Sequence, residues 1–339
     1  MVSDQTLVPV TEASQIGEAR RVGARLAHAA GFDESDLGRV TLVATELATN
    51  LARYGEDGRI LVQSLLSAEG TTIEILAIDT GPGMADLPRC LQDGYSTGGT
   101  SGNGLGAVRR MSTRFDVYST AGRGTVVMAR ISGAQPSPAS PRFRWGVVSL
   151  PAPNEQVCGD SWRVAERGRE IAVMVADGLG HGPLAAEAAE RAAVTFDQYA
   201  FQDPRIVVEH AHRALVGSRG AAIALARVSD TSTVQYAGMG NISSSLVNHE
   251  RSTGMVSQNG TIGVQIRKVQ QMQYTWPERG LLVMHSDGLT NRWSFDAYPG
   301  LSGRHPAVIA GVLARDFARG RDDATVLVVG DGESEGTYA

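Results

Sequence analysis

Glu46-Leu-Ala-Thr-Asn50 and Asp177-Gly-Leu-Gly-His-Gly182 are the two segments that decide the fold of this 339-residue chain, one in each half. The first lies in a series of apolar residues with a period of 3.6, which predicts an amphipathic helix. The second follows the apolar run 171–176, which is typical of a buried strand. A chain of this length is expected to form about two domains, each with its own core.

Composition excludes several classes of protein. The chain is 42% hydrophobic and 20% charged, with a net charge of −5, as expected of a globular protein. It has no basic cluster, which argues against nucleic acid or a membrane surface as a partner. Its two cysteines, Cys90 and Cys158, are too few for a disulfide framework, and the N-terminus lacks a signal-peptide pattern. We therefore expect a cytoplasmic protein.

A segment rich in Pro and Ser, Gly133-Ala-Gln-Pro-Ser-Pro-Ala-Ser-Pro141, separates the halves and predicts an extended linker. The expected organisation is a first domain over residues 1–132, a linker over 133–142, a second domain over 143–330 and a disordered tail over 331–339.

Both halves mix helices with strands, so the expected fold class is α+β throughout. In the first half the patterns predict helices over 14–30, between Ser35 and Gly55, and over 105–111, with strands over 60–66, 72–78, 115–119 and 125–131. In the second half they predict helices over 183–199 and from Pro204, with strands over 144–150, 170–176, 221–228, 233–237, 280–285 and 324–329.

Three segments of the first half suit a bound nucleotide. Glu46 and Asn50 share one helix face, either as a solvated surface pair or as a base and a magnesium ligand. Asp79 ends an apolar strand and can accept a hydrogen bond from an adenine amino group, while Gly81 and Gly83 allow close backbone approach. The glycine-rich stretch 94–106 leads into a helix whose amides can bind phosphates, and it is not a P-loop.

These segments resemble the GHKL ATP-binding family, and within it the serine/threonine switch kinases of bacterial partner-switching and stressosome modules. The resemblance covers residues 8–131 and includes Asp93-Gly-Tyr-Ser-Thr-Gly-Gly99, Gly104-Leu-Gly-Ala-Val-Arg-Arg-Met111 and Gly122-Arg-Gly-Thr125. It implies an α/β sandwich of the Bergerat type that binds ATP and Mg²⁺. The residues that it implies are Glu46 as base, Asn50 on magnesium, Asp79, Gly81 and Gly83 around adenine, and Thr97, Gly102, Gly104, Gly106 and Thr125 as further nucleotide contacts.

Acidic residues of the second half cluster at predicted strand ends. Asp177 and Asp287 each end an apolar run, and Asp322 precedes one. Any one of them could be ordinary turn chemistry. Carboxylates that converge at one sheet edge would instead repel one another unless Mg²⁺ or Mn²⁺ neutralised them. Two such ions can bind a phosphate and share a water of lowered pKa.

The second half resembles the PPM-type protein phosphatases of the SpoIIE branch over about residues 143–330. The hallmark Asp177-Gly-Leu-Gly-His-Gly182 carries the resemblance, with Gly238-Met-Gly-Asn-Ile242 and Asn259-Gly-Thr-Ile-Gly263. It implies an α-β-β-α sandwich holding two Mn²⁺ or Mg²⁺ ions. The implied ligands are Asp160, Asp177, the carbonyl of Gly178, Asp287 and Asp322, with Asp323 as the alternative to Asp322.

The two resemblances together imply a bifunctional enzyme that phosphorylates and dephosphorylates serine or threonine on a STAS-domain regulator of a bacterial partner-switching pathway. One alternative is a phosphatase whose ATP domain only senses nucleotide or docks the partner, which the intact Glu46 disfavours. Another is a binding module that sequesters a sigma factor. The sequence allows a homodimer. Two opposed activities that ran together would consume ATP without net change, so we expect them to be regulated.

Overall fold

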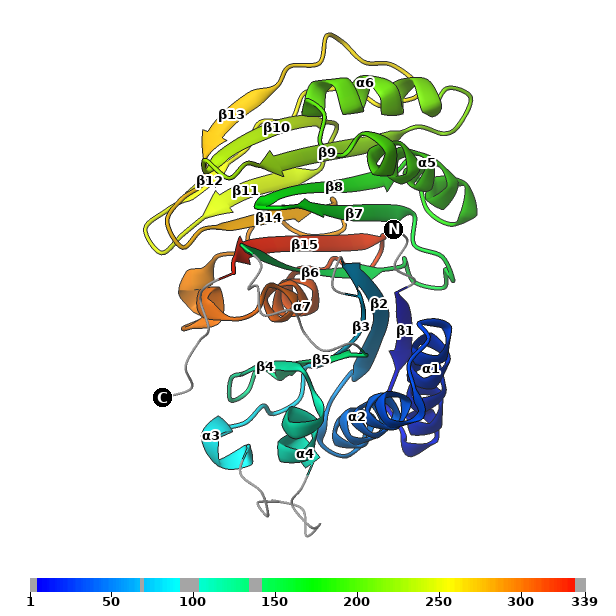
Figure 1. The fold of residues 1–339 in the computed structure, drawn as a ribbon, viewed down its shortest axis with the longest axis vertical. Helices are drawn as coiled ribbons and strands as arrows, with labels where there is room; N and C mark the ends of the chain where they lie inside the picture. The colour runs from blue at the N-terminus through cyan, green and yellow to red at the C-terminus, as the bar shows by residue number, and fades with distance from the viewer. Residues whose placement is uncertain (1–4, 68–69, 92–103, 134–141, 333–339) are drawn as a thin grey trace. The chain divides into compact units, whose positions relative to one another are not determined.

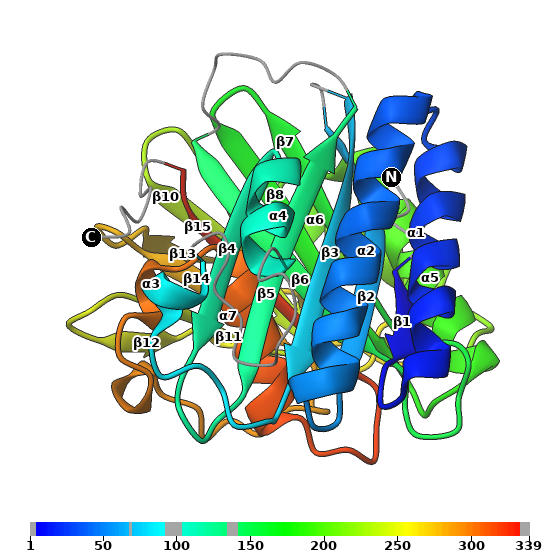
Figure 2. The same cartoon turned by 90° about the horizontal axis from the view of Figure 1, so that it is seen from below.

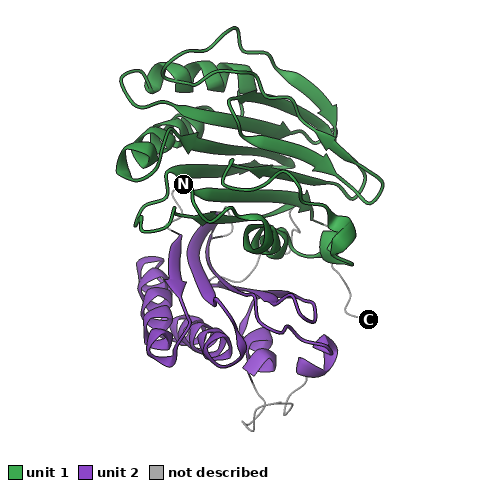
Figure 3. Cartoon of the chain, turned by 180° about the vertical axis from the view of Figure 1, so that it is seen from behind, with its two compact units in different colours: residues 1, 140–335 green, residues 2–139, 336–339 purple. Residues whose placement is uncertain are grey.

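The structure, a computed structural model, describes residues 5–67, 70–91, 104–133 and 142–332. The chain divides into two compact units at residues 139 and 140 (Figure 3), which are called the N-terminal and C-terminal units below. This boundary falls within the segment 133–142 for which the sequence predicts a linker. Residues 333–339, most of the predicted tail, lie outside the described residues.

The N-terminal unit is one antiparallel sheet with helices on one face (Figures 1 and 2). The strand order is β1-β2-β3-β5-β4. The strands are β1 Thr6–Pro9, β2 Arg59–Ser67, β3 Gly70–Asp79, β4 Arg114–Ser119 and β5 Thr125–Ser132. The helices are α1 Ile16–Ala29, α2 Glu34–Tyr54, the one-turn α3 Leu87–Cys90 and α4 Gly104–Met111, with a 3₁₀ turn η1 Ala13–Gln15.

Helix α2 organises this unit because its apolar stripe packs onto the sheet. The Asp33 side chain caps its N-terminus by accepting a hydrogen bond from the Asp36 amide, and Gly55 follows its last residue. The buried residues of α2 recur every three or four positions, as the sequence predicted: Val40, Val43, Ala44, Leu47, Ala48 and Leu51. This stripe leaves Glu46 and Asn50 half-buried beside it.

The C-terminal unit is an α-β-β-α sandwich, the architecture that the resemblance implied. Its sheets have the orders β13-β10-β9-β8-β7 and β12-β11-β14-β15-β6 (Figure 1). The strands of the first sheet are β7 Asp160–Arg167, β8 Glu170–Gly178, β9 Ala221–Val228, β10 Thr233–Met239 and β13 Met272–Thr275. Those of the second are β6 Phe143–Leu150, β11 Ser243–Val247, β12 Ser252–Gly254, β14 Leu281–His285 and β15 Ala324–Asp331.

Helices cover the outer faces of both sheets. Helices α5 Pro183–Tyr199 and α6 Pro204–Ala214 pack on the first sheet, and α7 Pro306–Phe317 packs on β6 and β15 of the second. Two short 3₁₀ turns, η2 Phe295–Ala297 and η3 Leu301–Gly303, precede α7. A core of apolar and aromatic side chains, including Trp162 and Tyr236, fills the space between the sheets.

Several elements were not predicted from the sequence: β1, β7, β11–β13, α3 and α7. Strand β7 carries the polar residues Ser161 and Arg163, yet both are buried. The Arg163 guanidinium pairs with Glu190 and with Asp197 of α5. Helix α7 is buried from Pro306 to Ala314 and so lacks the amphipathic period that identifies a helix at a surface.

The contact between β6 and α7 leaves no room for a side chain at Gly146. A Cβ placed there would lie 2.2 Å from the Cα atom of Ala307. We expect Gly146→Ala to lower the free energy of unfolding by about 1–3 kcal/mol or more, because strand and helix must separate to accommodate it. Thermal unfolding would measure this loss. Gly303→Ala is the control, since a Cβ there meets nothing within 4 Å, and an equal effect of both substitutions would contradict the packing argument.

Candidate active sites

In the N-terminal unit, α2 and the start of α4 bring three predicted residues together. Glu46 and Asn50 lie one turn apart on α2. A Cβ placed on Gly104, the first residue of α4, would lie 3.5 Å from Glu46 Oε2 and 3.5 Å from Asn50 Oδ1. The positive end of the α4 dipole therefore lies beside a carboxylate and an amide oxygen. This is the polar composition that a magnesium-bound phosphate chain requires.

Asp79 lies at the end of β3, where its carboxylate is nearly buried. Its Oδ1 atom accepts a hydrogen bond of 2.8 Å from the Gly81 amide, which fixes the side chain at the turn. Thr125, the first residue of β5, pairs in register with Asp79, and its hydroxyl lies 2.9 Å from the Ser119 hydroxyl. The strand ends thus bring together two residues that the sequence separates by 46 positions.

Gly83 is required by the turn that follows Asp79. It has a φ of +67°, which favours glycine, and a Cβ there would lie 2.2 Å from the Thr120 carbonyl oxygen. The backbone of the turn therefore packs closely against the β4–β5 hairpin. Gly106 lies buried inside α4. Thr97 and Gly102 lie outside the described residues, so their predicted contacts with nucleotide stay predictions.

In the C-terminal unit, strand register brings the predicted carboxylates to one end of the sandwich. Asp160 begins β7 and pairs directly with Asp177 on β8. Asp287 follows β14 of the other sheet, and Asp322 and Asp323 directly precede β15. Gly178 must be glycine, because a Cβ there would lie 2.0 Å from the Ala185 carbonyl oxygen of α5.

Two buried carboxylate oxygens of this cluster have no hydrogen-bond partner among the described residues: Asp160 Oδ1 and Asp323 Oδ2. The other oxygen of each is occupied, since Asp160 Oδ2 accepts from the Ser286 hydroxyl at 2.7 Å and Asp323 Oδ1 accepts from the Ala152 amide at 2.8 Å. Buried oxygens without a donor are costly unless a cation or a proton satisfies them. Both fit the ligand set of a hard divalent cation.

Burial and the neighbouring charges raise the pKa values of two carboxyl groups of the cluster. Burial, together with the charges of Asp160 and Asp287, raises the pKa of Asp177 to about 9. Burial likewise raises the pKa of Asp160 to about 7, against the hydrogen bonds from Ser286 and Thr325 that lower it. Among the described residues no three His, Cys, Asp or Glu side chains converge as closely as a preformed metal cage requires. The features of this cluster that suit a metal ion are therefore the shared strand ends and the two unsatisfied oxygens.

The alternatives Asp322 and Asp323 occupy different environments. Asp322 is exposed, and its charge contributes to the raised pKa of Asp177. Asp323 is only 3% exposed, and its charge raises the pKa of Asp160. The charges of both residues therefore act on the cluster, that of Asp322 from an exposed position and that of Asp323 from a buried one.

Three polar residues beside the cluster were missed from the sequence. Ser286 holds Asp160 and also accepts a hydrogen bond from the Thr325 amide. The Asn241 amide donates to Asp287 Oδ2 at 2.6 Å. Arg219 lies against the hallmark loop, since a Cβ on Gly180 would lie 3.0 Å from its Nη1 atom, and its guanidinium makes no hydrogen bond or ion pair with another described residue. Asn241 lies in a segment that the resemblance singled out, Gly238–Ile242.

His181 of the hallmark segment is not placed as a metal ligand. Its Nδ1 atom lies 2.6 Å from Glu155 Oε1, and its side chain is 62% exposed. Glu155 belongs to the loop between β6 and β7. The contact ties that loop to the start of α5.

Comparisons with known proteins match each half of the chain to a different family. Residues 8–131 match the family model of the histidine kinase-like ATPase domain, and residues 167–330 match that of stage II sporulation protein E (SpoIIE). The serine/threonine-protein kinase RsbT of Bacillus subtilis (strain 168) is 34% identical over 128 residues, which cover 38% of this chain and 96% of the kinase. The phosphoserine phosphatase RsbX of the same organism is 26% identical over 145 residues, which cover 42% of this chain and 73% of the phosphatase.

A solved structure concerning the bacterial stressosome, "a modular system that has been adapted to control secondary messenger signaling", is 27% identical to this chain. The match covers 55% of this chain and 98% of that one, with a TM-score of 0.52. No helix among the described residues is long and apolar enough to cross a membrane.

Fold, sites and relatives together define the class: an enzyme with an ATP-binding serine/threonine kinase domain and a PPM-type phosphatase domain. The chain belongs to the histidine kinase-like ATPase family through its N-terminal domain, which is RsbT-like and is fused to an RsbX-like phosphatase domain of the SpoIIE type.

The raised carboxyl pKa values predict how stability depends on pH. Asp160 and Asp177 keep their protons in the folded state up to about pH 7 and 9, whereas the unfolded chain releases them near 3.8. The folded state therefore binds more protons over this range, and the stability of metal-free protein should fall as the pH rises from about 4 to 9. Thermal unfolding after EDTA treatment would measure it. Asp177→Asn should flatten the slope, and a melting temperature that rises over this range would contradict the argument.

Proposed function

We propose that the chain is a bifunctional switch enzyme that phosphorylates serine or threonine on a STAS-domain regulator and hydrolyses such phosphoesters, within a bacterial partner-switching pathway. The observation that carries the proposal is that each unit retains the polar groups for its own reaction. Glu46 and Asn50 face the start of α4, and the carboxylates of the C-terminal unit meet at one edge with two unsatisfied oxygens.

In the kinase site, each residue has a role that its position supports. Asn50 would hold Mg²⁺ through its amide oxygen, and Asp79 would accept a hydrogen bond from the adenine amino group. Bound Mg²⁺-ATP supplies the γ-phosphoryl group. Glu46 would accept the proton of the attacking hydroxyl as the new oxygen–phosphorus bond forms and the bond to the β-phosphate oxygen breaks. The start of α4, from Gly104, would stabilise the negative phosphates.

In the phosphatase site, the proposed ligands are Asp160, Asp177, the Gly178 carbonyl, Asp287 and Asp322, with Asp323 as the alternative to Asp322. Two Mn²⁺ or Mg²⁺ ions held there would supply a water of lowered pKa and charge to bind the phosphate. Ser286 orients Asp160, and Asn241 orients Asp287. Removal of a residue that hydrogen-bonds to a metal ligand commonly lowers metal affinity by about 10–100-fold.

A STAS-domain protein as substrate is what the resemblance to partner-switching kinases implies. The similarity to the serine/threonine-protein kinase RsbT and to a stressosome structure supports this proposal. The net charge of −5 and the lack of a basic cluster in the sequence argue against nucleic acid as the partner. Because opposed activities would cancel, we propose that one of them is suppressed while the other acts on a given phosphosite. Two fully active domains working together on one phosphosite would contradict this regulation.

The decisive experiment is intact-mass measurement of a STAS-domain protein encoded beside this gene after incubation with Mg²⁺-ATP. The Asp177→Asn variant silences the phosphatase, so we expect a gain of one phosphate that is lost when Asn50→Ala is added. Wild-type enzyme with Mn²⁺ should then remove the phosphate. ATP binding without any gain would favour a phosphatase whose ATP domain only senses nucleotide or docks its partner.

Arg219 is proposed to bind the phosphate of the phosphatase substrate, because its uncommitted guanidinium lies against the loop that carries Asp177 and Gly178. A charged hydrogen bond of this kind contributes about 1.5–3 kcal/mol. We expect Arg219→Ala to raise KM for p-nitrophenyl phosphate and the inhibition constant of inorganic phosphate by about tenfold or more, with little change in kcat. Arg213→Ala, at the exposed end of α6, is the control. Unchanged phosphate inhibition would contradict the role.

A further inference from the structure

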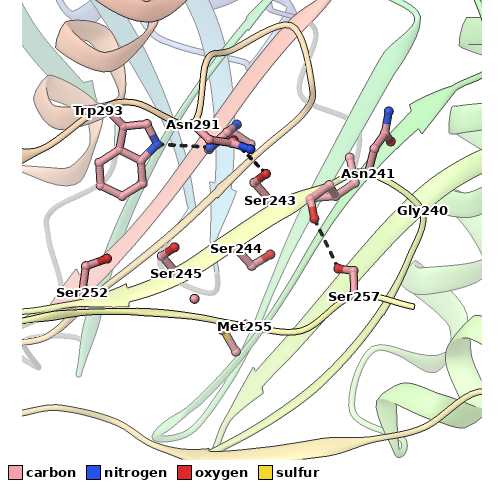
Figure 4. A pocket seen from close by; sticks show the side chains of 13 residues that line it. Gly240, Asn241, Ser243, Ser244, Ser245, Ser252, Met255, Ser257, Asn291 and Trp293 are labelled. Atoms are coloured by element: carbon pink, nitrogen blue, oxygen red, sulfur yellow. Dashed lines mark hydrogen bonds between the residues drawn. The ribbon is translucent and has the colours of Figure 1, made fainter. Parts of the chain in front are cut away.

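The C-terminal unit contains a pocket of about 450 Å³, whose lining side chains are drawn in Figure 4. Its lining is dominated by short hydroxyl side chains, which come from β11, β12 and the loops that follow them. We call it the serine pocket. The lining residues that carry the argument are Ser243, Ser245, Ser252, Ser257, Asn291 and Trp293.

Strand register places Ser243 and Ser245 of the serine pocket on the outer face of the second sheet, whereas its Ser244 and Ser257 contact Tyr236 between the sheets. Ser243 pairs with His285 of β14, and Ser245 pairs with Gly254 of β12. Paired residues project to the same face of an antiparallel sheet, so these positions share one surface. Helix α7 packs on β6 and β15 of this sheet, which leaves β14, β11 and β12 to form the pocket.

The serine pocket adjoins the metal cluster directly. Asn241, one of its lining residues, donates its amide hydrogen bond to Asp287 Oδ2 at 2.6 Å. His285, another lining residue, precedes Asp287 by two positions on the same strand end. When a phosphorylated residue of a protein substrate lies at the carboxylate cluster, the residues next to it must lie over the neighbouring surface. The serine pocket is part of that surface, because Asn241 contacts both the pocket and Asp287.

The lining is polar but uncharged, which restricts what it can bind. It contains no Lys, Arg, Asp or Glu. Its single imidazole is held in one tautomer, because His285 Nδ1 lies 2.9 Å from the Ser286 carbonyl and must donate, while Nε2 accepts from Trp293 Nε1 at 3.1 Å. A phosphate or nucleotide would lack the cations that it requires there. Hydroxyls and amides instead match peptide groups and short polar side chains.

We propose that the serine pocket binds an uncharged polar segment of the phosphoprotein substrate, adjacent to the phosphorylated residue. The inference rests on the proposed phosphatase function and extends it from the reaction to the sequence around the phosphosite. The Ser243 hydroxyl donates to Asn291 Oδ1 at 2.9 Å, which leaves the Ser243 oxygen as an acceptor and the Asn291 NH₂ group as a donor. Ser245 adds a hydroxyl, and the Trp293 indole adds one flat apolar surface. Substrate segments rich in Ser, Asn or Gly are favoured next to the phosphorylated residue. Segments with acidic or basic residues are disfavoured, because the pocket offers no counter-charge.

Gly254 offers a way to fill the pocket without straining the fold. A Cβ placed on it meets nothing within 4 Å, and it shares the pocket face with its partner Ser245. A Phe there extends into the pocket from the edge strand β12, where an aromatic residue is well tolerated. Gly303→Phe is the matched control, because Gly303 is equally unobstructed and does not line the pocket.

The test uses the full chain with Mn²⁺ and four substrates: p-nitrophenyl phosphate and three synthetic phosphoserine nonapeptides flanked by Ser and Asn, by Glu or by Lys. We expect wild-type kcat/KM to be about tenfold higher for the Ser/Asn peptide than for either charged peptide, as one or two net hydrogen bonds would give. Gly254→Phe should remove this preference and leave p-nitrophenyl phosphate hydrolysis unchanged. Gly303→Phe should behave as wild type.

Each other outcome has a distinct meaning. Equal wild-type rates on all three peptides would overturn the proposal, as would a preference that survives Gly254→Phe. An equal loss on p-nitrophenyl phosphate and peptides in Gly254→Phe would also overturn it, because the pocket would then serve the carboxylate cluster rather than the protein chain. Absence of wild-type hydrolysis of p-nitrophenyl phosphate would instead refute the phosphatase function itself.

Discussion

The mutual repulsion of buried carboxylates is the constraint on which the C-terminal unit depends. Strand register places Asp160 opposite Asp177, and the second sheet contributes Asp287 and Asp323 to the same end of the sandwich. Burial and repulsion raise the pKa of Asp177 to about 9, so the folded chain holds this arrangement against an electrostatic cost. The packed cores on either side of the first sheet supply the stability that offsets this cost.

The two units meet the charge of phosphate in opposite ways. The N-terminal unit presents the start of a helix beside one amide and one carboxylate, so much of its positive potential comes from the backbone. The C-terminal unit presents an excess of negative charge that becomes attractive to phosphate only through divalent cations. This difference suits the proposed reactions, because a nucleotide arrives with its own magnesium whereas a phosphoprotein does not.

The sequence predicted the parts of both sites that depend on local pattern. The period of α2 placed Glu46 and Asn50 on one face, and the apolar runs before Asp177 and Asp287 placed those residues at strand ends. Contacts across long sequence separations could not be predicted. Arg219 meets Gly180 across 39 positions, and Asn241 meets Asp287 across 46. Strand β7 was not predicted because it carries polar residues, which are nevertheless buried by tertiary packing. Helix α7 was not predicted because it is apolar on all sides and lacks an amphipathic period.

The contrast between the sites implies unequal dependence on free divalent cation. If the C-terminal unit holds divalent cations as proposed, scarce cation would leave its carboxylates metal-free with raised pKa values, so that activity and stability would fall together. In the N-terminal unit, Glu46 and Asn50 lie beside the start of α4, and Mg²⁺ would arrive there with the nucleotide. For the proposed switch enzyme, free divalent cation would then shift net phosphate flow toward dephosphorylation, while ATP would shift it toward phosphorylation. Regulation of the two opposed reactions therefore needs no communication between their sites.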